Sequence, residues 1–488
     1  MSIVAKFVKG SLLLSIASVV VRLSGVLVLV PLARLLGANQ LGIYSLVFFL
    51  VQSGSILGRL GVDIAMHRNG AQIYRTDPVA AGRLLGVGSV LMGLSFTILT
   101  AAVWLLRLPL AGYWLSNKDA AAWFGYAALT LFAEGISSIM MTGLLSLHNF
   151  KAHSLSTTAG ALSRLLLSPV LAWRYGLAGA FVGLMVGSWL QASVAFFYFR
   201  RSIQQHQILL NLENFRQESY QILRFGVPFY AGSALIGLVS LPMMGEIGRV
   251  AGVETLGELR IGQSLSQIVG FLPGAIAPVA VSILSEAHGT QSEDFQRLRS
   301  LHLRSNWILA LTLAMLLNLT AQSLIGVLFG KEYLGALPLV MGLSWWAALT
   351  VVVESVNLYS LTAGNTTAIA VAAVTQKVVF IGFTFGLIPQ WQGMAFVSGL
   401  LIASGLQLSI MLATIWQGLE TILQRQIGIL CLWSIASVCL AYGVEQLHLP
   451  TLISWLVTLF LLIAIAVLGI LSIVSAEEKS RLWGSRSK

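Results

Sequence analysis

The feature that most constrains this chain is a series of long apolar runs, each near the length of a membrane-spanning helix. About 20 consecutive apolar residues cross a bilayer core as a helix. Only 10% of the 488 residues are charged, whereas a soluble domain carries about 25%. The sequence therefore predicts an all-α polytopic membrane protein. The fourteen predicted spans cover residues 11–33, 41–60, 84–106, 121–147, 157–175, 177–199, 226–244, 259–285, 305–329, 336–362, 366–388, 392–416, 427–447 and 451–474.

The positions of lysine and arginine predict the orientation, because basic residues hold loops on the cytoplasmic side. With the N-terminus inside, 19 of the 29 basic residues fall in inner segments, 7 in outer segments and 3 within helices. Both termini are therefore expected to be cytoplasmic. This bias also accounts for the net charge of +11. No nucleic-acid partner is predicted, since no basic stripe carries interleaved aromatic residues.

The two halves of the chain repeat. Residues 34–42 match residues 249–257 at Arg, Gly, Leu and Gly positions, and both 128–134 and 348–354 read Ala-Leu-Thr followed by Glu. These matches predict two six-helix lobes of the same orientation. The polar stretch between them has the composition of a helix on the membrane surface. The predicted domains are an N-terminal lobe (1–199), an amphipathic cytoplasmic linker (200–225), a C-terminal lobe (226–416), and two additional helices with a cytoplasmic tail (417–488).

Five charged residues fall inside predicted spans and more than three residues from the span ends, where charges are costly and usually face an internal cavity. They are Arg22, Glu134, Arg164, Glu354 and Lys377. Arg22 shares a helix face with Ser18, which favours a cavity position. One interpretation gives the cations to an anionic substrate and the carboxylates to a coupling proton or sodium ion. The alternative is internal charge pairing, for example of Arg164 with Glu134.

Two further groups are candidates for substrate contact. Gln263 and Gln267 lie one helical turn apart, where their amides would bind sugar hydroxyls or bond to neighbouring helices. Arg59 and Arg68 lie at the inner end of the second span. They serve there as positive-inside anchors, or as an entry site for a phosphate-bearing headgroup at the cytoplasmic mouth.

Signals for catalysis are absent from the sequence. There is no convincing nucleophile–base pair, no metal-ligand cluster and no P-loop. No catalytic residue, metal or cofactor is therefore predicted, and transport would depend on an ion gradient, a partner or the gradient of the substrate.

Several short motifs resemble those of bacterial polysaccharide-type flippases, in the superfamily that contains multidrug and toxin extruders and lipid II flippases. They are Ser-Val-Val-Val-Arg-Leu-Ser-Gly (18–25), Ala-Arg-Leu-Leu-Gly (33–37), Leu-Gly-Ile-Tyr-Ser (41–45), Leu-Gly-Val-Asp (60–63), Phe-Leu-Pro-Gly (271–274), Pro-Val (278–279) and Ser-Ile-Leu-Ser (282–285). The resemblance extends to the span count and the duplication, and so to essentially the whole chain.

This resemblance implies two lobes around a central cavity and transfer of a polyprenyl-diphosphate-linked oligosaccharide from the inner to the outer leaflet of a bacterial plasma membrane. Arg22 matches a first-helix arginine that lines the cavity in lipid II flippases. The implied partners are the lipid-linked substrate, membrane lipids, a polysaccharide polymerase and other assembly proteins. The alternatives are a lipid II flippase or a cation-coupled drug extruder. A membrane glycosyltransferase or polymerase is disfavoured because its large outer loop is missing.

Overall fold

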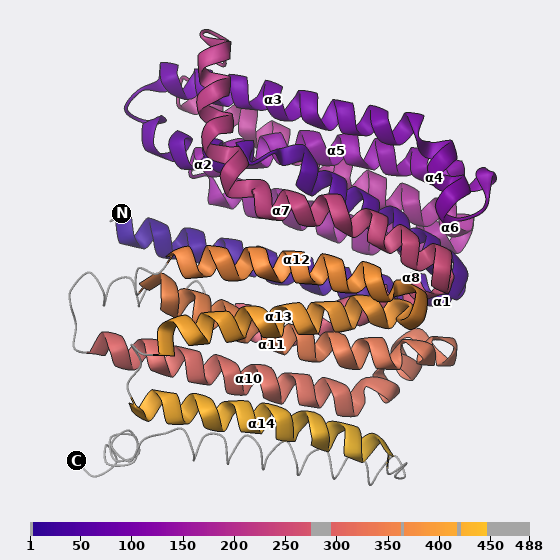
Figure 1. Cartoon of the computed structure of the whole chain (residues 1–488). Helices are drawn as coiled ribbons and strands as arrows, with labels where there is room; N and C mark the ends of the chain where they lie inside the picture. The colour runs from indigo at the N-terminus through magenta and orange to yellow at the C-terminus, as the bar shows by residue number, and fades with distance from the viewer. Residues whose placement is uncertain (1–2, 275–293, 363–365, 417–420, 447–488) are drawn as a thin grey trace, which may run out of the picture. The chain divides into compact units, whose positions relative to one another are not determined.

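The computed structural model describes residues 3–274, 294–362, 366–416 and 421–446, which form helices and short connections with no β-strand in those ranges (Figure 1). Eight helices in this part are long and apolar enough to cross a membrane. The chain is therefore an all-α, multi-pass membrane protein, as predicted. The count of fourteen spans remains a prediction, and the last predicted span, 451–474, lies outside the described residues.

The chain divides into two compact units. Unit 1 comprises residues 1–260 and 385–393, and unit 2 comprises residues 261–384 and 394–488. The helices of unit 1 are α1 (Ile3–Arg59), α2 (Val62–Ile73), α3 (Pro78–Leu105), α4 (Arg107–Trp114), α5 (Ala121–Ser146), α6 (Phe150–Gln205), α7 (Phe215–Ala251) and the start of α8 (Val253–Ser266). This division does not test the predicted boundaries of the two six-helix lobes, which stay a prediction.

Two helices of unit 1 are about twice the length that a bilayer requires. Leu13–Arg59 has 47 residues and Phe150–Gln205 has 56. Each contains one non-helical glycine, Gly37 with φ 71° in α1 and Gly176 with φ 58° in α6. A positive φ favours glycine and interrupts the regular path of a helix. Each of these helices therefore consists of two limbs joined at the short turns that the sequence predicts near residues 37 and 176.

A stripe of small residues holds the two limbs of α6 together. A Cβ atom added at Gly179, Gly183 or Gly187 would overlap atoms of Leu171, Ser168 or Arg164 on the other limb. Small residues four apart allow helix backbones to approach closely in membranes. This close approach places the Arg164 side chain directly over the second limb.

The predicted surface helix over 200–224 is interrupted. Helix α6 ends at Gln205, residues 206–214 are not helical, and α7 begins at Phe215. The reason is visible at α3, where the Asn211 N–H donates to the Gly82 carbonyl at 3.4 Å. The segment gives up helical hydrogen bonds and lies against α3 instead. The first part of α7 then runs across the direction of α3 and α5 (Figure 1).

The apolar core of unit 1 gathers around α2 and the parts of α3, α5 and α6 that pack against it. Met66, Leu85, Phe96 and Leu131 are buried together there. Burial of large apolar side chains contributes roughly 1.5–3 kcal/mol each. This core packs α3 against α2 and α5, and the last two helices form walls of the cavity described below.

Unit 2 contains the later helices of the chain, with a core around Trp307, Val356 and Met411. Its Trp307 Nε1–H donates to Ser434 Oγ at 3.1 Å, which links two of its helices. The helices assigned mainly to unit 2 are α10 (Asp294–Leu324), α11 (Leu337–Thr362), α12 (Thr366–Trp391), α13 (Gly393–Ile415) and α14 (Thr421–Gln446).

Candidate functional site

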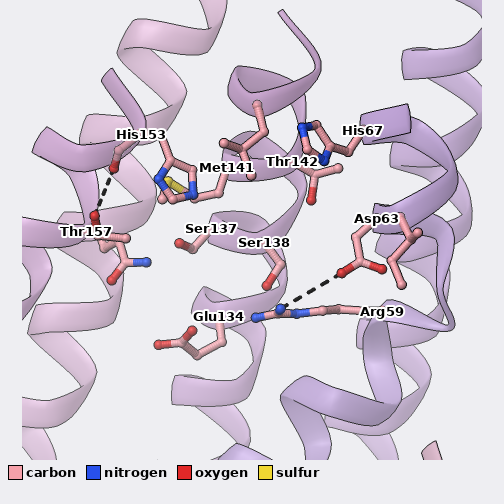
Figure 2. Close-up of a pocket in the computed structure, with 13 residues that line it drawn as sticks. Arg59, Asp63, His67, Glu134, Ser137, Ser138, Met141, Thr142, His153 and Thr157 are labelled. Carbon is pink, nitrogen blue, oxygen red and sulfur yellow. Dashed lines mark hydrogen bonds and ion pairs between the residues drawn. The ribbon is translucent and has the colours of Figure 1, made fainter. Parts of the chain in front are cut away.

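A polar cavity of about 280 Å³ lies within unit 1, between the C-terminal end of α1 and helices α2, α5 and α6 (Figure 2). Ionisable and hydroxyl side chains dominate its walls. The lining residues are Arg59, Asp63, Ile64, His67, Glu134, Ser137, Ser138, Met141, Thr142, Leu145, His153, Thr157 and Gln191. Two predicted site residues, Arg59 and Glu134, therefore line one cavity although 75 positions separate them in the sequence.

An ion pair borders this cavity at the level of Glu134. Arg164 Nη1 lies 3.4 Å from Glu134 Oε1, and the two side chains are 23% and 20% exposed. Ser188 Oγ donates to the same carboxylate oxygen at 2.7 Å. Arg164 Nη2 donates to Gln191 Oε1 at 3.2 Å. The structure thus contains the Arg164–Glu134 pairing that the sequence left open, whereas the roles of the two residues in substrate binding and ion coupling stay predictions.

A second ion pair lies at the predicted mouth, where α1 meets α2. Arg59 Nη1 is 3.9 Å from Asp63 Oδ2, across the turn between α1 and α2. Burial raises the pKa of Asp63 above its ordinary value, and the Arg59 guanidinium offsets part of this rise. Burial lowers the pKa of His67, which Asp63 partly offsets. The mouth therefore favours a neutral imidazole and makes proton uptake by Asp63 easier than in water.

Arg68, the second predicted mouth residue, does not line the cavity. Its guanidinium lies 4.6 Å from the centre of the Phe225 ring, and the residue is exposed. This stacking ties α2 to the first part of α7. Arg59 and Arg68 thus occupy different surroundings despite their similar positions in the sequence.

Arg22 and Ser18 are exposed on the first limb of α1. Ser18 Oγ donates to the Ser15 carbonyl at 2.8 Å, so this hydroxyl is engaged within its own helix. The neighbouring Ala17 and Ser24 are buried at 5%. The predicted polar face therefore points away from the packed side of the helix, and it leaves the Arg22 guanidinium accessible.

The predicted residues of the second half are dispersed. Lys377 Nζ donates to Gln376 Oε1 at 2.9 Å, and the Gln376 amide donates to Ser404 Oγ at 3.3 Å. Gln263 is half-buried, while Gln267 and Glu354 are exposed. Lys377 therefore contacts a neutral amide, in contrast to Arg164.

Sequence reasoning missed several polar residues of unit 1. Ser188 and Gln191 complete the network around Glu134, and His153 lines the cavity. Arg260 lies in α8 with its guanidinium 3.9 Å from the centre of the Phe48 ring. Only the spacing of Ser188 and Gln191, one turn apart on one face, offered a signal in the sequence.

Comparison with known proteins assigns the fold to a class. The structure of lipid II flippase MurJ in its inward closed conformation matches with a TM-score of 0.73 and 13% identity, over 97% of this chain and 99% of that one. An inward-facing MATE multidrug transporter of the MOP superfamily matches with a TM-score of 0.65 and 15% identity, over 84% and 98%. A MOP superfamily transporter from Pyrococcus furiosus matches with a TM-score of 0.57 and 15% identity, over 84% and 95%. The chain thus has the fold of MOP-superfamily transporters.

The family follows from the sequence itself. The profile of the polysaccharide biosynthesis protein family matches residues 7–288, and the chain belongs to this family. No curated protein sequence matches the chain. The structural matches carry the names of transporters and of a flippase.

Proposed function

We propose that this protein flips a polyprenyl-diphosphate-linked oligosaccharide from the inner to the outer leaflet of a bacterial plasma membrane, for surface polysaccharide such as O-antigen or exopolysaccharide. Membership of the polysaccharide biosynthesis protein family supports this substrate class over a drug. In this proposal both termini are cytoplasmic, and a polysaccharide polymerase with other assembly proteins uses the product.

The accessible guanidinium of Arg22 is the observation that carries the proposal. It lies on an apolar helix that qualifies as a membrane span, and its side chain is exposed. A diphosphate that leaves water needs cationic partners, and arginine binds phosphate oxygens through two parallel hydrogen bonds. Arg22 would therefore compensate the charge of the headgroup at membrane depth.

The half-buried carboxylate of Glu134 would couple transport to an ion gradient. Protonation would weaken its pairing with Arg164 at 3.4 Å and free the guanidinium for other partners. Glu354 occupies the corresponding repeat position and is assigned the same role. We expect Glu134→Gln and Glu354→Gln to change the dependence of export on the proton or sodium gradient, with unchanged dependence in both variants counting against coupling.

The test is a deletion strain complemented with wild type, Arg22→Ala or the control Arg174→Ala, which removes another exposed arginine. Lipid-linked oligosaccharide should accumulate on the inner leaflet in the deletion strain, and wild type and the control should clear it while Arg22→Ala does not. Absence of accumulation with normal surface glycan would reject the proposal and favour a drug extruder. Accumulation of lipid II would favour the lipid II flippase, and unpolymerised units on the outer leaflet would indicate an enzyme.

A further inference from the structure

The unit 1 cavity has a composition that the flipping of a diphosphate does not explain. We propose that it is a subsite for one uncharged sugar ring of the transported glycan, a role that rests on the proposed function.

The charges around the cavity are already compensated. Arg59 pairs with Asp63 at 3.9 Å, and Arg164 pairs with Glu134 at 3.4 Å. An anionic group would need one of these cations, and its release would leave a half-buried carboxylate unpaired. The cavity is therefore a poor site for a diphosphate, in contrast to the accessible guanidinium of Arg22.

Several polar atoms at the cavity nevertheless lack partners. Within the described part of the chain, Arg59 Nε, Asp63 Oδ1, Ser137 Oγ and His153 Nδ1 are buried and make no hydrogen bond. Ser137 as a whole is only 1% exposed. Buried polar groups without partners are costly, so such atoms usually mark a place for water or a ligand.

These atoms differ in kind, and this difference favours hydroxyl groups as their partners. Arg59 Nε can only donate, Asp63 Oδ1 accepts when the carboxylate is ionised, and Ser137 Oγ does both. A sugar hydroxyl is a donor and an acceptor at once, so neighbouring hydroxyls on one ring can satisfy all three. A metal ion or a proton would satisfy the acceptors and leave the arginine donor unpaired.

The remaining walls suit the less polar face of a sugar ring. Ile64, Met141 and Leu145 line the same cavity as the hydroxyl and charged side chains (Figure 2 shows Met141 among the polar residues). Its volume of about 280 Å³ lies just below the roughly 300–1,000 Å³ of sites for drug-sized ligands. The cavity therefore accommodates one ring and not a whole oligosaccharide.

The experiment is saturation-transfer-difference NMR on the purified full chain in nanodiscs, with D-glucose, D-galactose and N-acetylglucosamine as probes. At least one sugar should receive saturation from wild type. Ser137→Ala removes one hydroxyl and should weaken binding about two- to tenfold, the effect of one hydrogen bond. Ser137→Leu fills the cavity and should abolish the signal.

Ser193→Leu is the matched control, because Ser193 is exposed on the same helix as His153 and bonds only locally, to the Trp189 carbonyl at 2.9 Å. This variant should bind like wild type. Absence of signal from all three sugars, or equal signal with Ser137→Leu, would overturn the sugar subsite. If no sugar binds at the cavity while lipid-linked oligosaccharide is still cleared in an Arg22-dependent way, only the sugar subsite is rejected. If a sugar binds but lipid-linked oligosaccharide is not cleared, the proposed flippase function is rejected.

Discussion

Matching residues in the two copies of the repeat do not all lie in similar surroundings. Thr130 and Thr350 behave alike, since each hydroxyl donates to the carbonyl four residues earlier, at 2.8 Å and 2.9 Å. Glu134 and Glu354 do not, because Glu134 is half-buried and paired with Arg164, whereas Glu354 is exposed. Thr384 stands 220 residues after Arg164, so the second copy has no cation at that position.

The basic residues of the two units differ in the same way. Arg164 in unit 1 faces a carboxylate, a hydroxyl and an amide, whereas Lys377 in unit 2 contacts the Gln376 amide at 2.9 Å. A guanidinium presents its donors in a fixed planar fork, whereas an ammonium is a point charge on a flexible stem. The comparison indicates that Arg164 is held by a network that includes an ion pair, whereas Lys377 bonds to a neutral amide.

The largest effect is expected when a substitution breaks the Arg164–Glu134 ion pair of unit 1. Arg164→Leu leaves the Glu134 carboxylate half-buried without its cation, which should lower the free energy of unfolding by about 2–3 kcal/mol. Lys377→Leu should cost less than about 1 kcal/mol, because a single bond to a neutral amide is lost. Thermal unfolding in detergent measures both. Equal losses would remove the distinction between the units, and adding Glu134→Gln to Arg164→Leu should recover part of the loss.

A second prediction concerns the glycine stripe that positions Arg164. In Gly187→Ala the new methyl group overlaps Arg164 Cγ, and overpacking of this kind costs about 1–3 kcal/mol. Gly405→Ala in α13 is the control, since no atom lies within 4 Å of the added Cβ. It should be neutral or stabilising by up to about 1 kcal/mol. A stable Gly187→Ala protein would show that the limbs of α6 separate easily.

A smaller effect is expected at Ser188, which donates to Glu134 at 2.7 Å. Ser188→Ala should lower the free energy of unfolding by about 1 kcal/mol, the net value of one hydrogen bond. Ser193→Ala, which removes an exposed hydroxyl on the same helix, should change it by less than about 0.5 kcal/mol. The same melting experiment compares the two, and no difference between them would place Ser188 outside the network.

The smallest expected effect is the change of thermal stability with pH near the turn that follows α5. Burial, with His67 and Arg75 nearby, lowers the pKa of His148 below its ordinary 6.5. A lowered histidine pKa means that stability is lost as the pH falls below about 6.5. His148→Gln should therefore reduce the drop in Tm between pH 7 and pH 5.

For Asp63 the expected change of stability with pH has the opposite sign, which provides a check. Its pKa is raised by burial, so acid favours the folded state, and Asp63→Asn should enlarge the drop in Tm. Shifts of the same sign in His148→Gln and Asp63→Asn would contradict these assignments.

The class of fold was predictable because long apolar runs with few charges admit few structures. The turns at residues 37 and 176 were predictable as well, since each interrupts an apolar run at a glycine. The interruption of the linker helix was not predictable, because its composition suits a surface helix. The hydrogen bond from Asn211 N–H to the Gly82 carbonyl on α3 cannot be read from that composition. The partners of Glu134 were equally hidden, since Ser188 and Gln191 reach it only through the close approach of the two limbs of α6.

The most direct test of the central claim is translocation of a labelled polyprenyl-diphosphate oligosaccharide in proteoliposomes. We expect the wild-type protein to move the glycan across the bilayer and Arg174→Ala to do so at the same rate. Arg22→Ala should be no faster than empty vesicles. Wild-type transport that survives in Arg22→Ala would contradict the role of the arginine. A wild-type protein that moves no glycan would contradict the proposed function itself.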